Sequence, residues 1–326
     1  QAYCETCASV GMVFWNQRMN SLTGNAEYID VLERSLYNGA LDGLSLSGDR
    51  FFYGNPLAST GKHSRKEWFG TACCPSNIAR LIASLGSYVY GQEGNKIYVN
   101  LFVGSETVFP LQKGSMGFSM KTNYPWNGDV QCKISLQKKE KSMIAFRIPG
   151  WAKDIPSPGS LYAFSEKQVS MPILTVNGVQ QDYVEQNGYA TIDREWEDGD
   201  LIEFKLSMPI RKILSRDELR QNKGRMALQR GPLVYCVEGA DNEGKAWNIT
   251  APLQSTYTTE DFSVLDEKVV SIVSNLPVVK ISADSSAVQT VFQKVRAIPY
   301  YTWCNRGSNP MQVWLPTAVK DIKINY

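Results

Sequence analysis

Four residues near the start of the chain have side chains that could together bind a metal ion. Glu5 and Cys7 lie two residues apart in the segment CETC, and Cys73 and Cys74 are adjacent. Zinc accepts thiolate and carboxylate ligands in tetrahedral geometry, so three thiolates and one carboxylate would complete a four-coordinate site. Residues two apart cannot face the same way on a regular helix, but they can converge in its first turn or just before it. The spacing therefore makes these four residues candidate ligands, with Cys4 as a competitor for the place of Cys7.

The pair Cys73-Cys74 has a second property that matters for catalysis. It immediately precedes Pro75-Ser76-Asn77, where a proline and polar capping residues predict the start of a helix. Unpaired backbone N–H groups and the positive end of the helix dipole favour a thiolate over a thiol at such a position. A cysteine placed there is a candidate nucleophile as well as a candidate ligand. The alternative is that these cysteines only fill core space, because free cysteine is among the most buried residue types; a vicinal disulfide between them would be strained.

The remaining cysteines and the single histidine are less informative. Cys132, Cys236 and Cys304 lie in strand-like runs, which predicts that they pack in the core. His63 lies in the polar segment GKHSRKEW, and we expect it to be a solvated loop residue. A Ser-His-Asp or Cys-His site contained in this chain would have to use His63. Nucleotide-binding glycine motifs and the H-E-x-x-H zinc motif do not occur in the sequence.

Carboxylates and aromatic side chains near the cysteines suit carbohydrate chemistry without proving it. Paired carboxylates cleave glycosidic bonds, yet nothing in the spacing of Glu5, Asp49 and Glu67 singles out an acid or base. Aromatic faces bind sugar rings but also fill cores. The aromatic residues close to the cysteines in sequence are Trp15, Phe51, Phe52, Tyr53, Trp68 and Phe69.

The composition excludes several classes of protein. The chain has 326 residues with a formal net charge of +2, so binding to nucleic acid through a basic surface is not expected. Hydrophobic residues make up 43% of the chain, which is ordinary for a globular protein and argues against disorder. No apolar run approaches the ~18 residues of a membrane-spanning helix. The first residues, QAYCETCAS, resemble an internal stretch of a larger protein, and we expect the chain to be a C-terminal portion.

Helices are predicted in the first 90 residues. Residues 4–22 carry apolar side chains at helical spacing and stop at Thr23-Gly24, and a second helix is predicted from Ala26 to Leu41. These two helices would form a hairpin. Residues 45–59 predict a small hairpin or ordered loop, and a third helix is expected to begin at Pro75-Ser76-Asn77.

Strands are predicted in the rest of the chain. From about residue 90, short runs rich in β-branched and aromatic residues alternate with turn signals such as Asn-Gly and Asp-Gly-Asp. This pattern predicts β-sandwich structure in two units. The fold class is therefore mixed, with helices in residues 1–100, one β-sandwich in residues 101–225 and a second in residues 226–326.

Several segments resemble glycoside hydrolase family 127, typified by bacterial β-L-arabinofuranosidases. They extend from residue 3 to about residue 316: YCETCAS, RKEWFGTACCPSNIARLIASLGSYVYG, FRIPGWA, LQRGPLVYCVE, IPYYTWCNRG and VWLP. The ETC and CCPSN motifs together are the most specific of these. The resemblance implies that residues 1–100 are the last helices of an (α/α)6 catalytic barrel, followed by the two β-sandwiches.

The resemblance also implies a reaction and a site. In this family the Glu and Cys of ETC and both cysteines of CCP bind zinc, which places Glu5, Cys7, Cys73 and Cys74 as ligands. The first cysteine of CCP is the nucleophile of a retaining glycosidase, and this role falls on Cys73. The general acid/base glutamate lies upstream of ETC in family members and cannot be assigned to any residue of this chain.

The resemblance therefore predicts that this chain alone does not turn over substrate. The implied substrate is a plant-type glycan or oligosaccharide carrying β-L-arabinofuranose. A bacterial periplasmic or cytoplasmic setting is implied, without a membrane or nucleic-acid partner, whereas sugar specificity and oligomeric state are not defined.

Two other functions are compatible with the sequence. The chain could be a non-catalytic carbohydrate-binding or structural β-sandwich module in which zinc only stabilises the fold. It could also be a thiol redox protein, although Cys4-Glu5-Thr6-Cys7 is followed by predicted helices and not by a βαβ pattern.

Overall fold

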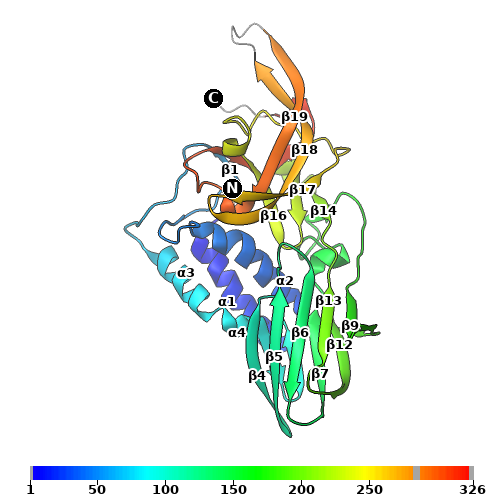
Figure 1. Ribbon diagram of the computed structural model, residues 1–326. Coiled ribbons are helices and arrows are strands. Elements are labelled where there is room, and N and C mark those ends of the chain that lie inside the picture. The colour runs from blue at the N-terminus through cyan, green and yellow to red at the C-terminus, as the bar shows by residue number, and fades with distance from the viewer. Residues whose placement is uncertain (1–2, 282–286, 323–326) are drawn as a thin grey trace.

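A layer of helices lies beside two β regions. The computed structural model describes residues 3–281 and 287–322, and Figure 1 shows the helices packed between a long lower β region and a large upper sheet. The described residues contain four α-helices: α1 (Thr6–Thr23), α2 (Ala26–Arg34), α3 (Cys73–Ser84) and α4 (Gly86–Val89). None of their helices is long and apolar enough to cross a membrane.

The helical hairpin is confirmed, but its second arm is less regular than predicted. Gly24 ends α1 in the left-handed conformation (φ 64°), and the Asn25 side chain accepts a hydrogen bond from the N–H of Glu27 to begin α2. The expectation of one helix to Leu41 was wrong. After Arg34 the chain forms a π-helical turn over Ser35–Ala40 and a 3-10 turn over Leu41–Gly43.

The third helix begins two residues earlier than predicted. Cys73 and Cys74 are its first two residues, with Ala72 as the N-cap residue, so both cysteines lie inside the first turn. The Ser76 hydroxyl donates to the Cys73 and Ala72 carbonyls and does not cap the N-terminus. The side chain of Asn77 points instead to a sulfur of α1.

The first β region is a sandwich of two sheets around one core. Apolar side chains from both sheets share this core, for example Phe146 and Phe204, whose rings lie 5.1 Å apart. In order across the six-stranded sheet, the strands are β10 (Val179–Gln180), β9 (Ile173–Val176), β13 (Leu201–Lys205), β6 (Asp129–Leu136), β5 (Gly114–Thr122) and β4 (Ser105–Leu111). Across the five-stranded sheet they are β11 (Val184–Gln186), β12 (Tyr189–Trp196), β7 (Glu140–Arg147), β3 (Lys96–Val99) and β2 (Tyr90–Glu93).

The second β region is a ten-stranded sheet with apolar side chains on both faces. Its main path runs β17 (Thr258–Val264), β18 (Glu267–Ile281), β19 (Val288–Pro299), β16 (Leu233–Glu238), β15 (Arg225–Arg230), β14 (Ile210–Ser215) and β8 (Tyr162–Phe164). Three short strands join it at the side: β1 (Ala58–Thr60), β20 (Pro310–Gln312) and β21 (Leu315–Pro316). Along β16, Leu233, Tyr235 and Val237 pack into one core while Cys236 packs into another, as alternation along a strand requires.

The chain is therefore mostly β-sheet with few helices. The domain boundaries at residues 100 and 225 stay predictions, and so does the assignment of the helices to a barrel.

Buried polar contacts fasten the helices to both β regions. Arg147 of β7 is fully buried; it donates to Asp30 at 2.6 Å, to Glu33, and to the Asn100 carbonyl at 2.7 Å. Asn38, in the π-helical turn, donates to the Pro232 carbonyl at 2.9 Å. Neither contact could be inferred from local sequence, because the partners are far apart along the chain.

Candidate metal centre

The structure brings the four candidate ligands together. Glu5 is the N-cap residue of α1, Cys7 lies in the first turn of that helix, and Cys73 and Cys74 open α3. One ligand atom from each lies within 4.8 Å of all the others. Among the described residues this group includes Cys7 and not Cys4, which favours Cys7 as the candidate from the first motif.

The distances within the group suit a tetrahedral ion. The Cys7 and Cys74 sulfurs are 3.3 Å apart, the Cys73 and Cys74 sulfurs 3.8 Å, and Oε1 of Glu5 is 3.5 Å from the Cys73 sulfur. Zinc–sulfur bonds of ~2.3 Å in a tetrahedron place neighbouring sulfurs ~3.8 Å apart. The donor set and its spacing therefore fit zinc.

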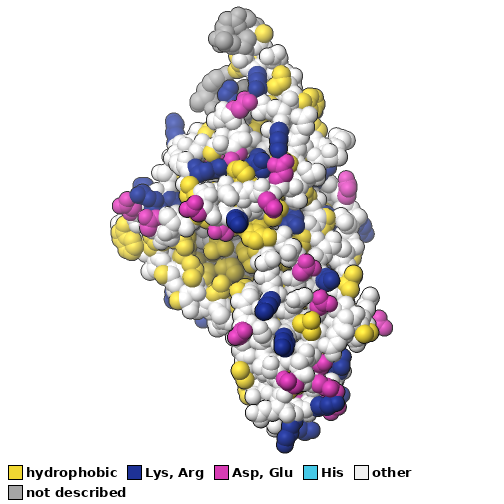
Figure 2. Space-filling model, in the orientation of Figure 1, with side chains coloured by type: hydrophobic (Ala, Val, Ile, Leu, Met, Phe, Trp, Pro, Cys, Tyr) yellow, Lys and Arg dark blue, Asp and Glu magenta, His cyan; other side chains and the backbone are white. Residues whose placement is uncertain are grey.

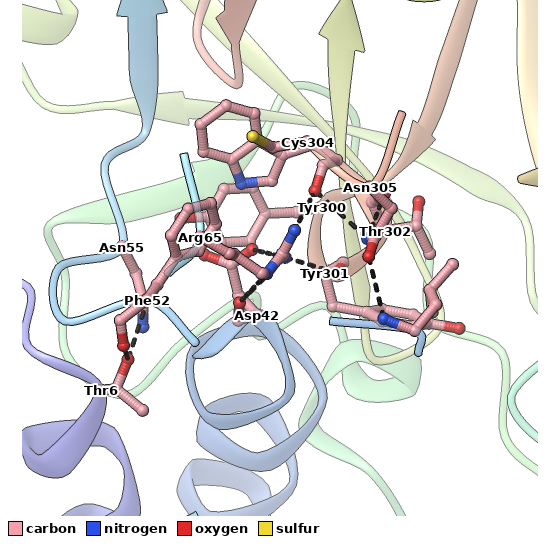
Figure 3. Close-up of polar contacts among 12 residues, drawn as sticks. Thr6, Asp42, Phe52, Asn55, Arg65, Tyr300, Tyr301, Thr302, Cys304 and Asn305 are labelled. Atoms are coloured by element: carbon pink, nitrogen blue, oxygen red, sulfur yellow. Dashed lines mark hydrogen bonds and ion pairs between the residues drawn. The ribbon is translucent and has the colours of Figure 1, made fainter. Parts of the chain in front are cut away.

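Backbone pairing holds the first motif in place. The chain around Glu5 forms an antiparallel bridge with Gly54; the Thr6 N–H donates to the Tyr53 carbonyl at 2.9 Å. The buried Thr6 hydroxyl lies 2.8 Å from the Phe52 carbonyl and 3.1 Å from Oδ1 of Asn55 (Figure 3). Because these contacts fix the backbone on both sides of Glu5, its carboxylate is presented in one direction.

Two glycines let the turns after α2 approach α1 closely. A Cβ atom on Gly39 would lie 2.4 Å from the Ser9 hydroxyl, and one on Gly43 would lie 2.3 Å from the Thr6 side chain. Any side chain at either position would push the start of α1 away. The irregular helical turns therefore serve to position the end of α1 that carries Glu5 and Cys7.

Contacts of Arg65 with the C-terminal region hold the loop that leads to the second motif, Cys73-Cys74. Arg65, in the loop that leads to Cys73, is buried; it donates to the Asp42 carbonyl at 3.0 Å and to the Trp303 carbonyl at 2.7 Å. Its guanidinium also lies 4.1 Å from the centre of the Phe52 ring. Figure 3 shows Arg65 reaching from this loop to the segment around Tyr301 and Cys304, which belongs to the C-terminal region.

Burial makes the Cys7 and Cys74 thiols costly to ionise without a cation. Desolvation raises the pKa of the Cys7 thiol, although a hydrogen bond from Asn77 partly opposes this. The Cys74 side chain is 0% exposed, and burial raises its pKa well above the ordinary value. A bound cation would supply the charge that these sulfurs need to become thiolates.

His63 is not the solvated residue that we predicted. It is half-buried, with its ring 4.5 Å from that of Phe52 and stacked on Trp303 at 5.8 Å. Its Nε2 lies 3.0 Å from the Gly54 carbonyl, and burial lowers its pKa below the ordinary 6.5. The sequence around His63 is polar, and the aromatic partner Trp303 lies too far along the chain to be recognised.

A cavity of about 720 Å³ lies elsewhere, between the two β regions, whereas one of 580 Å³ adjoins the first motif. Tyr53, His63, Phe69 and Thr71 contribute to the lining of the smaller one.

Of the aromatic residues noted in the sequence, Phe52 is a core residue, whereas Trp15 and Trp68 are exposed. The cysteines predicted to lie in the core, Cys132, Cys236 and Cys304, are confirmed as buried.

Comparison with known proteins identifies the family of this chain. Residues 1–87 match the profile of the β-L-arabinofuranosidase GH127 catalytic domain, residues 96–208 the GH127 middle domain, and residues 210–316 the glycoside hydrolase family 127 C-terminal domain. This chain belongs to glycoside hydrolase family 127.

Relatives of this GH127 chain include enzymes of known structure. It is 33% identical to a non-reducing end β-L-arabinofuranosidase of Bifidobacterium longum, over 96% of this chain and 49% of that protein. A GH127 β-arabinofuranosidase structure superimposes with a TM-score of 0.94 at 38% identity, over 99% of this chain and 50% of that one. The structure of a GH127 β-L-arabinofuranosidase from Geobacillus stearothermophilus superimposes with a TM-score of 0.86 at 37% identity, over 97% of this chain and 50% of that one. The GH127 chain thus spans about half the length of these relatives.

Proposed function

We propose that this chain supplies the metal–thiolate part of the active site of a retaining β-L-arabinofuranosidase. The observation that carries the proposal is the convergence of Glu5, Cys7, Cys73 and Cys74 to within 4.8 Å. Membership of GH127 and the activity for which the Bifidobacterium longum relative is named support the reaction class. A plant-type glycan with a terminal β-L-arabinofuranosyl group is the proposed substrate.

Zinc is the proposed ion, with Glu5, Cys7, Cys73 and Cys74 as its ligands. When bound, zinc supplies the positive charge that keeps buried sulfurs in the thiolate form near neutral pH. The residues of this chain then orient the thiolates, and the surrounding apolar side chains limit access of water.

Cys73 is the proposed nucleophile. Its sulfur is only partly buried, and Thr71, two residues before it, lines the adjoining cavity. The sulfur forms a C–S bond with the anomeric carbon while the glycosidic C–O bond breaks, and the leaving oxygen takes a proton from an acid. Water then attacks the same carbon and gives a proton to the conjugate base of that acid, while the electron pair of the C–S bond returns to sulfur; the two displacements retain the configuration.

The acid/base residue is proposed to lie outside these 326 residues, so the chain alone would not hydrolyse substrate. Residues 1–100 are then the last helices of an (α/α)6 barrel, and residues 101–225 and 226–326 are β-sandwich domains. The half-length coverage of relatives supports this. So does the exposed apolar surface of α1, where Trp15 is 62% and Leu22 81% exposed. Figure 2 shows hydrophobic side chains gathered in a hollow over the helical part of the molecule.

Two measurements test the proposal. Elemental analysis should find one zinc per chain, and clearly less in Cys73→Ser. An electrophilic sugar analogue added to the full-length enzyme should label Cys73. A label on another residue, or full zinc retention in Cys73→Ser, would contradict the roles proposed for Cys73. Hydrolysis of an aryl β-L-arabinofuranoside by residues 1–326 alone would show that the acid/base is within them.

A further inference from the structure

Asn77 makes a direct contact with one of the three sulfurs. It lies on α3, four residues after Cys73 and three after Cys74, so it shares their face of the helix. Its side-chain nitrogen Nδ2 is 3.3 Å from the Cys7 sulfur and donates to it. The contact crosses from α3 to α1, and therefore joins the two motifs independently of any bound ion.

The three sulfurs have different surroundings. Cys74 is completely buried, within 3.8 Å of both other sulfurs and of Glu5. Cys7 and Cys73 are both partly exposed. The Cys73 sulfur has contacts with Glu5 and Cys74 but no side-chain amide donor among the described residues. Exposure alone would leave Cys7 and Cys73 as two competing nucleophiles, and the amide of Asn77 distinguishes them.

We propose that Asn77 is a positioning residue that suppresses Cys7 as a nucleophile and so directs attack to Cys73. An N–H donor withdraws electron density from a thiolate and occupies one of its lone pairs, which lowers its reactivity toward carbon electrophiles. It also holds the Cys7 side chain in the orientation of a ligand. The inference rests on the proposed function, because it assigns unequal roles to thiolates of the same centre.

Alkylation mapping tests this inference without an activity assay. The zinc-loaded, purified protein is treated with limiting iodoacetamide, and the modification rates of Cys7 and Cys73 are followed separately by peptide mass spectrometry. The unmodified sequence should react mainly at Cys73. Asn77→Asp, which keeps the shape but loses the N–H donor, and Asn77→Leu should raise the rate at Cys7 about fivefold or more relative to Cys73.

Two control variants distinguish an effect on the reactivity of Cys7 from a general effect on the structure of the site. Asn77→Gln keeps an amide donor and should largely retain the selectivity for Cys73. Ser76→Ala changes the neighbouring residue, whose hydroxyl bonds only to backbone carbonyls, and should leave the rate ratio unchanged. The cobalt-substituted protein gives a second readout, since loss of the donor should shift the sulfur-to-cobalt charge-transfer band in Asn77→Asp and Asn77→Leu but not in Ser76→Ala.

The outcomes discriminate between this inference and the proposed function. Zinc retained in every variant with an unchanged ratio of Cys7 to Cys73 alkylation would overturn the role of Asn77 alone. Loss of zinc in both Asn77→Asp and Asn77→Leu would make Asn77 a structural requirement and would also overturn the tuning role. Absence of zinc from the unmodified protein would overturn the metal centre itself.

Discussion

Cys74 of the helical region is as buried as the cysteines of the β regions, whereas Cys7 and Cys73 are partly exposed, and the two groups have different neighbours. Cys132 and Cys236 belong to apolar cores, and burial raises the pKa of each thiol. Burial raises the pKa of Cys7 and Cys74 as well, yet their sulfurs lie 3.3 Å apart and close to Glu5. Burial alone therefore does not distinguish a metal ligand from a core residue. The distinguishing feature is a second sulfur or a carboxylate within reach of the same ion.

The largest expected effect is on kcat, and it should distinguish the cysteines of the helical region from those of the β regions. In the full-length enzyme, Cys73→Ser should lower kcat by about 10³-fold or more, because the proposed nucleophile is lost. Cys236→Ala, in the β region, should retain kcat within a small factor. Equal losses in the two variants, measured with an aryl β-L-arabinofuranoside at a temperature where both are folded, would remove the distinction.

Chelation should distinguish the two groups of cysteines by its effect on the free energy of unfolding. Removing zinc should lower the free energy of unfolding by about 3–4 kcal/mol when free zinc had been 100- to 1,000-fold above its Kd. Calorimetry of the protein with and without chelator measures this change. Cys132→Ala should show the same chelator-dependent shift, whereas Cys74→Ala should show almost none.

A buried hydroxyl tests the core cysteines directly. Cys132→Ser places an O–H group in the sandwich core and should cost about 1–3 kcal/mol, while zinc content stays unchanged. Cys132→Ala, which adds no polar group, is the matched control for lost volume. If Cys132→Ser lost zinc while remaining folded, the two groups of cysteines would not be independent.

The smallest effect concerns a contact between a cysteine of the C-terminal region and the loop that leads to Cys73. The Cys304 thiol, from the C-terminal region, lies 3.3 Å from the carbonyl of His63, in the loop that leads to Cys73. The pKa of His63 is lowered from 6.5 by burial, so the unfolded chain binds more protons between the two values. Stability should therefore rise with pH through that window and fall on acidification.

The chain has a single histidine, so NMR titration can follow this group without ambiguity. A measured pKa at or above 6.5 would contradict the buried position of His63. In Phe52→Leu, which removes one ring from the stack, the pKa should move back toward the ordinary value.

Features that depend on neighbouring residues were predictable from the sequence. The hairpin of α1 and α2 and the start of β structure near residue 90 followed from periodicity and turn residues, and the grouping of the four candidate ligands followed from the ETC and CCP motifs. The start of α3 was misplaced because Pro75 suits the first turn, and the rule does not say how many residues precede it inside the helix. The π-helical turn over Ser35–Ala40 was missed because local periodicity does not mark it, and the close approach of its Gly39 to Ser9 is a tertiary contact.

Contacts that complete the site could not be predicted from the sequence. The sequence indicates a capping role for Asn77, although its amide bonds to Cys7. Arg65 depends on Trp303, which lies 238 residues further along the chain. Such pairs carry no local periodicity, and only the folded chain shows that they are neighbours.

The pairing of β1 with β20 has a consequence for how this protein can be divided. Ser59 lies opposite Met311, so the loop between the ETC and CCP motifs supplies a strand to the C-terminal sheet. A cut between the helical and C-terminal regions would leave that loop without its partner strand and Arg65 without the Trp303 carbonyl. The helical and C-terminal regions are distant in sequence but interlocked in space, so we expect a chimaera that takes them from two relatives to be stable only if it keeps this strand pairing.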